Sequence, residues 1–536
     1  MFGTDIWRIK WSTWFIPVIV PIIWYCVWIR SRFVRLVNKL PGPKQFPLLG
    51  NLLELSVDYD EFLRILTSDW VKKYGSIYRA WLTVHPVIFI ASPELLEPIL
   101  GSHSLISKPK EYQLLKAFIG NSLALITGDR WKIRRRLLTP AFHIQHVNNF
   151  VTIFNEKSVD TARQMEHALD VHDELDVFPI MTQCALDILC ESSIGRKTRS
   201  QEEKDLYFQN LHKVQLVFME RIVKPWLGID WLFQLTNLGR LNKHYVAAAR
   251  SFTDLVIRDR RAWLKMKLEK YRNRGALQET QDDIVNQEEH LYQSRERPAL
   301  LDILLKASEE GEMISEDDIK DEVNLFMVAG HETTAITLSM CLYLLAKHPE
   351  QQNLAMKELR QVFGESTRPC SIHDLSQLRY LECCLKETLR LYTPVPFIMR
   401  YLTVDVQTGD YTLPKGATVA LMLYSMHRNP LFYPDPESFK PERFLSENNI
   451  TRHQYAFIPF SAGPRSCIGQ KFAMLKLQVC LANWLRRFHF SVKDPSAPLF
   501  VPSVEVTLKP KHGVHLVIKK RSAKSMKTAM SPATAF

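Results

Sequence analysis

The 536-residue chain lacks the features that divide, cross-link or repeat a protein. It has no Gly/Ser-rich or Pro-rich low-complexity linker and no internal repeat, so we expect one large domain rather than the three or four that length alone suggests. Its nine cysteines are an odd number with no disulfide-scaffold spacing and no CxxC pair, which indicates a reducing compartment and mostly unpaired thiols. No GxGxxG sequence occurs in a strand–turn–helix context, so redox chemistry would need electrons from a separate protein.

The chain carries a positive formal charge of +12, and 46% of its residues are hydrophobic, enough for a sizeable core. Such a charge suits nucleic acid, an anionic membrane surface or an acidic protein partner. The basic residues are scattered and form no aromatic-plus-basic binding module. Nucleic acid binding is therefore not expected.

An uncharged, mostly apolar run occupies residues 11–29, which is long enough for a helix to cross a bilayer. Arg8 and Lys10 precede it and more basic residues follow, which favours a cytosolic C-terminal side. A cleavable signal peptide is the alternative, but the run is long for one and no small-x-small cleavage site follows. We predict an uncleaved transmembrane anchor over residues 1–30.

The sequence after the anchor divides into a hinge, a body and a tail. Residues 31–50 form a basic, proline-rich hinge, stiffened by Pro41, Pro43 and Pro47. Residues 51–520 form the catalytic domain, and residues 521–536 are a polar tail that we predict to be disordered. This is the organisation of an enzyme held at a membrane surface.

The body is predicted to be mainly α with small β-sheets. Helical periodicity occupies residues 93–100, 145–169, 178–193, 250–272, 316–347 and 349–362. Strand patterns occupy residues 77–82, 87–91, 418–423 and 514–518. The polar stretch 271–298 is predicted to be a long surface loop, with a domain boundary as the alternative.

One predicted helix, residues 316–347, is unusually long. Ser315 and Asp318 form an N-terminal capping pair, and His348-Pro349 ends a helix of roughly 48 Å. The polar quartet "HETT" at 331–334 interrupts its apolar centre, and such breaks are expected at functional sites. The alternative is a hydroxyl that bonds back to its own helix. A zinc HExxH motif is excluded because position 335 is alanine.

The stretch "FSAGPRSCIG" sets one cysteine, Cys467, just ahead of a predicted helix. A metal is the strongest reason for a thiolate. A single cysteine excludes tetrahedral zinc and iron–sulfur sites but fits haem iron, where thiolate pushes electron density into the O–O bond. Gly463 and Gly469 would allow a flat cofactor to approach closely and would permit positive φ around the cysteine.

Phe460, Gly463, Arg465, Cys467 and Gly469 reproduce FxxGxRxCxG, the haem-binding signature of the cytochromes P-450, which this chain resembles. Four further motifs follow the order of that family: "WKIRR" at 131–135, "AGHETT" at 329–334, "ETLR" at 387–390 and "PERF" at 441–444. The resemblance covers essentially the whole chain. Finer detail, such as "CALDILCESSIG", looks like the family-4 branch, typically fatty-acid ω-hydroxylases.

The resemblance implies a cytochrome P-450 fold, a single large helical haem domain around a long central helix, and a role for each matching residue. Cys467 would be the axial thiolate of haem b. Four residues are nominated to hold the haem propionates: Trp131, Arg135, Arg400 and Arg465. The alternative is that the tryptophan lies on the helix surface and the arginines are solvated. Three residues would brace the pocket without catalysing: Glu387, Arg390 and Arg443. Glu332 and Thr333 would deliver protons to bound oxygen, unless the threonine kinks its helix and the acid is salt-bridged elsewhere.

One position departs from the branch, which often has glutamate linked covalently to haem where this chain has Ala329. Without that carboxyl group, we expect no covalent haem link through position 329, and strict terminal-carbon selectivity is less assured. The implied function is hydroxylation of a fatty acid or related lipid at or near its terminus. It would use O₂ and NADPH–cytochrome P-450 reductase, with cytochrome b5 as an optional second donor. The implied location is the endoplasmic reticulum membrane, single-pass, with the catalytic domain cytosolic.

Three alternatives stay open at this point. A xenobiotic-oxidising monooxygenase is the first. The others are an electron-independent haem-thiolate isomerase or dehydratase, and a non-catalytic haem-binding protein. The Glu332-Thr333 pair argues against the isomerase, which needs no proton relay to O₂. The motifs leave the substrate itself open.

Overall fold

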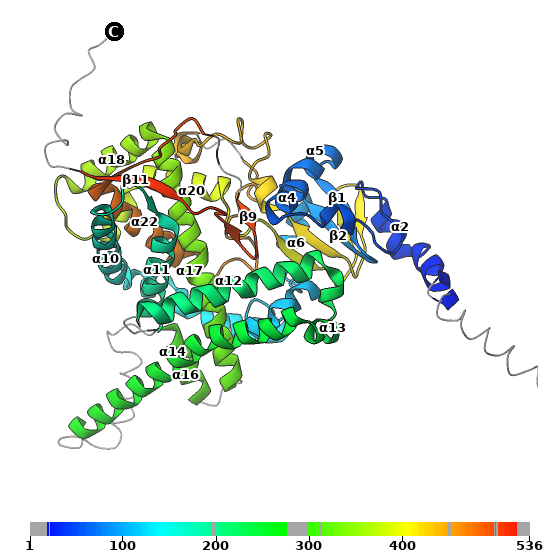
Figure 1. The fold of residues 1–536 in the computed structure, drawn as a ribbon, viewed down its shortest axis with the longest axis horizontal. Coiled ribbons are helices and arrows are strands. Elements are labelled where there is room, and N and C mark those ends of the chain that lie inside the picture. Colours follow the sequence, from blue (N-terminus) through cyan, green and yellow to red (C-terminus); the bar gives the residue numbers. More distant parts are fainter. Residues whose placement is uncertain are drawn as a thin grey trace, which may run out of the picture.

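The computed structural model describes residues 19–20, 22–194, 200–275, 299–309, 314–448, 452–497, 499 and 502–521. A larger helical part and a smaller part built around a sheet lie side by side, with α2 (Arg32–Asn38) at the sheet end (Figure 1). Most of the predicted anchor, most of the predicted loop 271–298 and nearly all of the predicted tail lie outside the described residues. The described end of the anchor, residues 22–29, is helical and largely exposed.

The elements of the first half of the chain are mostly helical: α3 (Leu52–Leu55), α4 (Tyr59–Arg64), η1 (Ile65–Asp69), α5 (Trp70–Tyr74), α6 (Pro93–Leu100), η2 (Lys110–Leu115), α7 (Lys116–Ile119), α8 (Gly128–Leu138), η3 (Thr139–Phe142), α9 (Ile144–Asn148), α10 (Val151–Leu169), α11 (Val177–Leu189), η4 (Cys190–Ile194), α12 (Gln201–Val223), η5 (Pro225–Gly228), α13 (Asp230–Leu235) and α14 (Asn237–Gly275). The helices of the second half are α16 (Leu300–Glu309), α17 (Glu316–Lys347), α18 (Pro349–Phe363), α19 (Ile372–Gln377), α20 (Arg379–Leu391), α21 (Leu423–Met426), η6 (Pro441–Phe444), η7 (Ser446–Asn448) and α22 (Gln470–Arg487).

The strands are short: β1 (Ile77–Leu82), β2 (His85–Ile90), β3 (Leu175–Asp176), β4 (Ile398–Tyr401), β5 (Val406–Thr408), β6 (Tyr411–Leu413), β7 (Thr418–Leu421), β8 (Phe488–Ser491), β9 (Ser503–Val504), β10 (Leu508–Lys509) and β11 (His515–Lys520). The main sheet has the order β1-β2-β7-β4, with β2 and β7 parallel and the other pairs antiparallel. The four predicted strands all exist. The one predicted over 418–423 ends early because Leu423 begins α21.

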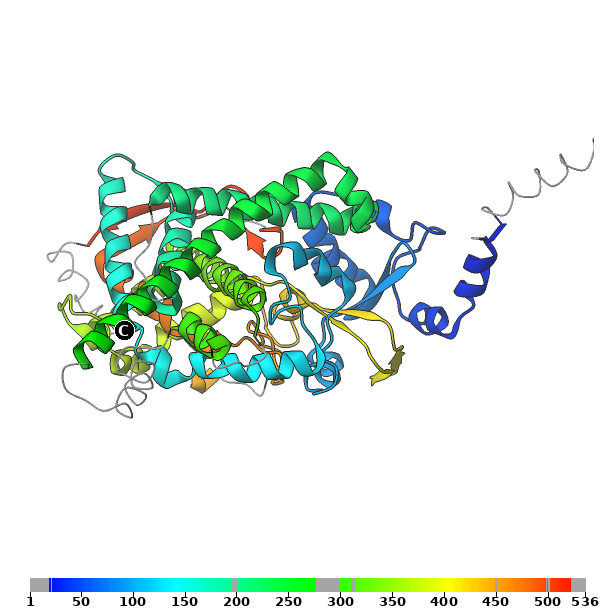
Figure 2. The ribbon, with the colours of Figure 1, turned by 90° about the horizontal axis from the view of Figure 1, so that it is seen from below.

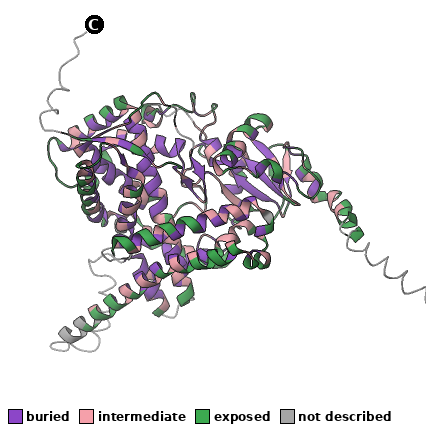
Figure 3. Ribbon diagram, in the orientation of Figure 1, coloured by how far each residue is buried: buried purple, intermediate pink, exposed green. Residues whose placement is uncertain are grey.

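Helix α17 has the bounds that the sequence predicts, with a full Ser315–Asp318 capping box. It passes through the middle of the helical part and is mostly buried (Figures 1 and 3). Among the described residues it is the one helix long and apolar enough to cross a membrane, but 67% of its most apolar window is buried in the protein. It is therefore the core helix around which the other elements pack.

Three predicted helix boundaries are wrong. The helix predicted over 145–169 is interrupted after Asn148, because asparagine side chains compete with the helical backbone. Helix α11 ends at Leu189 and passes into the wider turn η4. Helix α14 begins at Asn237, thirteen residues before the predicted start at 250, because the Thr236 hydroxyl accepts a hydrogen bond from the Gly239 N–H (3.0 Å) and caps its first turn. Helices α12 and α14 pack against each other along one face of the body (Figures 1 and 2).

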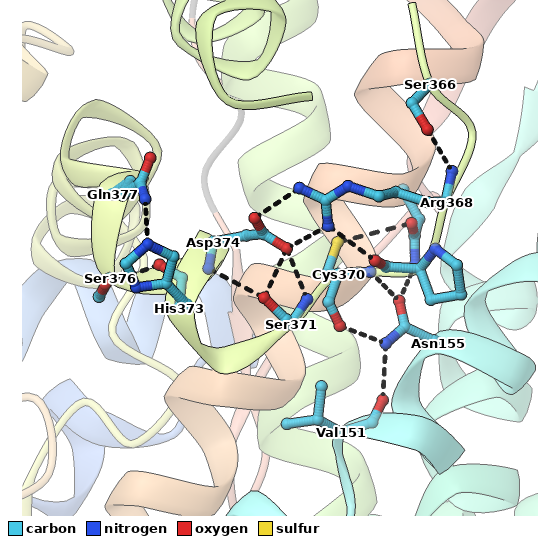
Figure 4. A network of polar contacts seen from close by, with 12 residues as sticks. Val151, Asn155, Ser366, Arg368, Cys370, Ser371, His373, Asp374, Ser376 and Gln377 are labelled. Carbon is cyan, nitrogen blue, oxygen red and sulfur yellow. Dashed lines mark hydrogen bonds and ion pairs between the residues drawn. The ribbon is translucent and has the colours of Figure 1, made fainter. Parts of the chain in front are cut away.

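A polar network ties α10 to the segment before α19 (Figure 4). The Asn155 amide donates to the Cys370 carbonyl and accepts from the Cys370 N–H, both at 2.9 Å. The amide of Asn483 on α22 donates to the same Asn155 oxygen at 3.1 Å. A surface groove of about 670 Å³ lies beside this network, and Cys467 does not line it. The network therefore supports the fold on a side of α22 away from the cysteine loop.

Candidate functional site

Cys467 lies in the loop that leads into α22. The Cys467 N–H donates to the Phe460 carbonyl at 2.8 Å, which closes the loop into a compact turn. Gly463 has φ of 70°, and a Cβ there would lie 1.9 Å from the Leu100 carbonyl oxygen, so only glycine fits. Gly469 has an ordinary φ of −90°, so the positive-φ turn predicted there is wrong. Its N–H bonds the Cys467 sulfur instead.

The cysteine side chain is exposed to a cavity of about 310 Å³, which we call the cysteine cavity. The cavity lies between the Cys467 loop and α17, whose Ala329 and Thr333 line it. Desolvation raises the pKa of the Cys467 thiol, while the Gly469 N–H and the Arg135 charge act in the opposite direction. The thiol therefore needs a bound metal ion to become a thiolate at neutral pH.

Buried cations converge beside this cavity. Burial, and to a lesser extent repulsion by Arg400, lowers the pKa of Arg465 to about 9. Burial also lowers the pKa of Lys108 well below its ordinary value, and the charges of Arg400 and Arg465 add to this shift. None of the three forms an ion pair with a carboxylate of the described part of the chain, and the Arg465 Nε has no hydrogen-bond partner there. Two carboxylates such as haem propionates would satisfy this arrangement, so the residues present fit haem. Lys108 belongs to no motif and was missed in the sequence.

Helix α8 presents Trp131 and Arg135 to the cysteine loop, as their i,i+4 spacing predicts. The Arg465 guanidinium lies 4.8 Å from the centre of the buried Trp131 ring. Arg135 Nη1 donates to the Ser466 carbonyl at 3.0 Å. Neither residue is the solvated surface residue of the alternative hypothesis, since both contact the loop that carries Cys467.

A second residue missed in the sequence is Lys476, which is fully buried on α22. Its ammonium donates to the carbonyls of Ala185 (3.1 Å) and Gly330 (3.2 Å). Burial lowers the pKa of Lys476 to about 8. The residue joins the helix that follows Cys467 to the centre of α17. A lysine within a mostly apolar helical pattern gives no signal of such a contact.

The polar quartet of α17 makes the hydrogen bonds of the alternative considered in the sequence. Thr333 Oγ1 donates to the Ala329 carbonyl at 2.8 Å, and Thr334 Oγ1 donates to the Gly330 carbonyl at 3.0 Å. The Glu332 carboxylate forms an ion pair with Lys509. The amide of Gln215 on α12 also donates to both Glu332 oxygens, at 2.8 Å each.

These contacts keep Glu332 ionised although it is buried. Burial alone would raise its pKa, but the charge of Lys509, followed by smaller contributions that include the Gln215 hydrogen bond, brings the pKa below the ordinary value. Burial lowers the pKa of the neighbouring His331 to about 4, so that imidazole is neutral at physiological pH. The carboxylate is held on the α12 side of α17, whereas Thr333 lies at the cysteine cavity.

A second cavity, of about 330 Å³, is lined almost entirely by apolar side chains, and we call it the apolar cavity. Ala329, Thr333 and Val395 line both cavities. The two spaces therefore meet at α17, opposite Cys467. A compartment for a flat cofactor opens there onto a compartment for an apolar ligand.

Glu387, Arg390 and Arg443 come together as predicted, and the pair on α20 is fully buried. Arg390 binds both Glu387 oxygens, at 2.8 and 2.7 Å. Its other N–H groups donate to the carbonyls of His427, Pro436 and Ser438. Arg443 Nε lies 3.3 Å from Glu387 Oε1. The network fastens the segment that leads to the cysteine loop onto α20.

The comparisons with known proteins agree with this site. The Cytochrome P450 family profile matches residues 40–517. The chain is 38% identical to Cytochrome P450 4c3 of Drosophila melanogaster, over 92% of this chain and 91% of that protein. It is 34% identical to Cytochrome P450 4V2 of Homo sapiens, over 90% of this chain and 89% of that protein. The chain thus belongs to the cytochrome P450 family of monooxygenases, whose members bind haem b through a cysteine thiolate, and its relatives are of the family-4 type.

Proposed function

We propose that this protein is a membrane-anchored haem-thiolate monooxygenase that hydroxylates a long-chain fatty acid or related lipid at or near its terminus. The observation that carries the proposal is the junction of the cysteine cavity and the apolar cavity at Ala329, Thr333 and Val395. An elongated apolar ligand can lie in one cavity with one end directed into the other. The family-4 relatives support the lipid class as the first choice.

Cys467 would hold the haem iron, and five residues would hold the propionates: Lys108, Trp131, Arg135, Arg400 and Arg465. When bound, haem supplies the activation of O₂ and the insertion of one oxygen atom into a C–H bond. The buried cations orient the group by charge. Ala329 has no carboxyl group to esterify it, so we propose that it is held without a covalent link at that position.

Thr333 and Glu332 would divide the handling of protons. The Thr333 hydroxyl lies at the junction of the cavities and now donates to the Ala329 carbonyl, so rotation about χ1 would redirect its hydrogen into the cysteine cavity. Glu332 is ionised and paired with Lys509, so its carboxylate is a proton acceptor rather than a donor. We therefore assign donation into the cysteine cavity to Thr333. To Glu332 we assign the acceptance of protons from the α12 side and their transfer onward to the Thr333 hydroxyl.

Electrons would come from NADPH–cytochrome P-450 reductase, with cytochrome b5 as an optional second donor. Lys132 and Arg136 are exposed on α8, whose other face contacts the cysteine loop. A positive surface close to the haem ligand suits an acidic flavoprotein.

The proposal predicts NADPH-dependent hydroxylation when the full-length protein is combined with the reductase in lipid vesicles and given twelve- to eighteen-carbon lipids. Hydroxylated product should appear together with O₂ consumption, and neither should appear without the reductase. Thr333→Val should lower product formed per NADPH by about tenfold, because electrons are diverted to peroxide or water when the hydroxyl is missing. Turnover of a peroxide without NADPH would indicate an isomerase, and oxidation of planar aromatic compounds alone would indicate xenobiotic clearance.

We also propose a single-pass anchor in the endoplasmic reticulum membrane, with the catalytic domain in the cytosol. The described end of the segment, including Trp24 and Val27, leaves large apolar side chains exposed, which water disfavours and lipid accepts. A chain that begins at Arg30 should lose most of its co-sedimentation with vesicles and should keep its haem. Loss of haem in this shortened chain would show instead that the segment is part of the fold.

A further inference from the structure

The apolar cavity carries acidic side chains and no basic ones. Glu111, Glu332 and Glu505 line it, whereas no lysine, arginine or histidine does so among the residues that the structure describes. Lys509 pairs with Glu332, and the His212 imidazole lies 3.3 Å from Glu505. Lys108, which lies 4.2 Å from the centre of the Tyr112 ring at the cavity wall, would be held by the haem propionates. A carboxylate that entered the cavity beside Glu332 and Glu505 would lose its water and would meet two like charges there.

Besides one oxygen each of Glu111 and Glu505, two uncharged buried side chains in the same cavity have a polar atom without a hydrogen-bond partner. Gln215 is only 3% exposed, and its Oε1 is unpaired while its amide nitrogen serves Glu332. Thr507 is only 5% exposed, and its Oγ1 is unpaired. Buried polar atoms are nearly always hydrogen-bonded, so two unpaired ones in a ligand cavity point to groups that a ligand would satisfy.

Gln215 and Thr507 belong to two segments, α12 and the β9–β10 turn, that contacts join on both sides of these residues. His212, one turn before Gln215 on α12, pairs with Glu505 in the β9–β10 turn. Gln215 itself contacts Glu332, which pairs with Lys509 at the other side of the same turn. Thr507 lies between Glu505 and Lys509 in the chain, so the two contacts hold its segment against the part of the cavity that Gln215 also lines.

We propose that the apolar cavity binds a lipid whose polar end is a neutral hydrogen-bond donor, a long-chain alcohol rather than a free fatty acid. The alcohol oxygen would accept from Thr507 Oγ1, and its hydrogen would go to Gln215 Oε1. The inference rests on the proposed monooxygenase function and narrows its substrate class. Glu332 and Glu505, which lie beside this site, favour a neutral donor over an anion, whereas the apolar walls accept the hydrocarbon chain.

Three ligands with a twelve-carbon chain test the head group on the haem-loaded full-length protein: dodecan-1-ol, dodecyl methyl ether and dodecanoate. Equilibrium titration, followed by the change in the haem spectrum, gives each dissociation constant. The alcohol should bind at least about tenfold more tightly than the carboxylate and about threefold more tightly than the ether, which can only accept hydrogen bonds. Carboxylate binding as tight as that of the alcohol would overturn the proposal, because the acid head would then lie elsewhere.

Variants locate the head group. Thr507→Val should weaken the binding of the alcohol and of the ether alike, by about threefold, because both oxygens would accept from this hydroxyl, and Thr507→Ser should retain both affinities. Thr161→Val is the matched control, since Thr161 is equally buried on α10 and lines neither cavity. Unchanged affinity for the alcohol in Thr507→Val, or no binding of any of the three ligands, would overturn the proposal. Tight binding of the alcohol without any NADPH-dependent product would contradict the monooxygenase function and not the head-group assignment.

Discussion

Cys467→Ser should leave a chain that folds but no longer retains haem, with turnover lowered by at least about a hundredfold. The thiolate is the proposed ligand, and Ala329 offers no ester that could keep the haem in its absence. The cations near the cysteine cavity would contact only the propionates and could not replace a bond to iron. The measurement is haem per chain, together with the red-shifted Soret band that reduced thiolate-ligated haem gives under carbon monoxide.

Cys383→Ser is the control for Cys467→Ser, because this cysteine is buried on α20 outside both cavities. It should keep full haem content and an unchanged band. A normal band in Cys467→Ser would mean that another group ligates the iron.

Replacing Arg390 should have the largest effect on stability. In Arg390→Met the Glu387 carboxylate, which is 0% exposed, would lose its bidentate partner and keep only Arg443 and the Lys440 N–H. Breaking a buried ion pair costs about 3–5 kcal/mol, and three carbonyls would also lose their donors. We expect the urea midpoint of the haem-loaded protein to fall accordingly, and haem content to fall with it.

Arg163→Met supplies the comparison for Arg390→Met. Arg163 pairs with Asp160 at 3.3 Å with the same i,i+3 spacing, but that pair is exposed to solvent. Exposed pairs contribute about 0–1 kcal/mol, so this variant should change the midpoint little. If the two variants shifted the midpoint equally, the Arg390 network would not be the brace that its geometry indicates.

The parts of the site that the sequence predicted are those encoded by closely spaced residues. Cys467 and Arg465 stand in one loop, Trp131 and Arg135 on one helix face, and the bounds of α17 follow from its cap and its terminating proline. The spacing of such residues along the chain determines their relative positions, because residues that are close in sequence within one loop or helix are also close in space. The fold class was predictable for the same reason.

The residues that were missed act through contacts between distant segments. Lys509 lies 177 residues from Glu332, yet it holds that carboxylate on the α12 side. Lys476 reaches a carbonyl 146 residues away. Neither contact has a sequence pattern, because each depends on how three or more elements pack. Gly469 is the opposite case, in which a local motif misleads. Its place beside Cys467 suggested a positive φ, but as the residue that caps α22 it has an ordinary negative φ.

The burial of Lys476 has a consequence for proton linkage. The unfolded chain keeps the proton on this lysine up to a pH near its ordinary pKa of 10.5, whereas the folded protein releases it near 8. Between these two values the unfolded state binds more protons than the folded state, so the contribution of Lys476 to stability rises with pH. Below pH 8 both states carry the proton, and the folded protein bears the full penalty of a charge enclosed among carbonyls and thiols. At neutral pH the contact between α22 and the centre of α17 therefore includes a buried charge that lowers the free energy of unfolding. This destabilisation would disappear in alkaline solution.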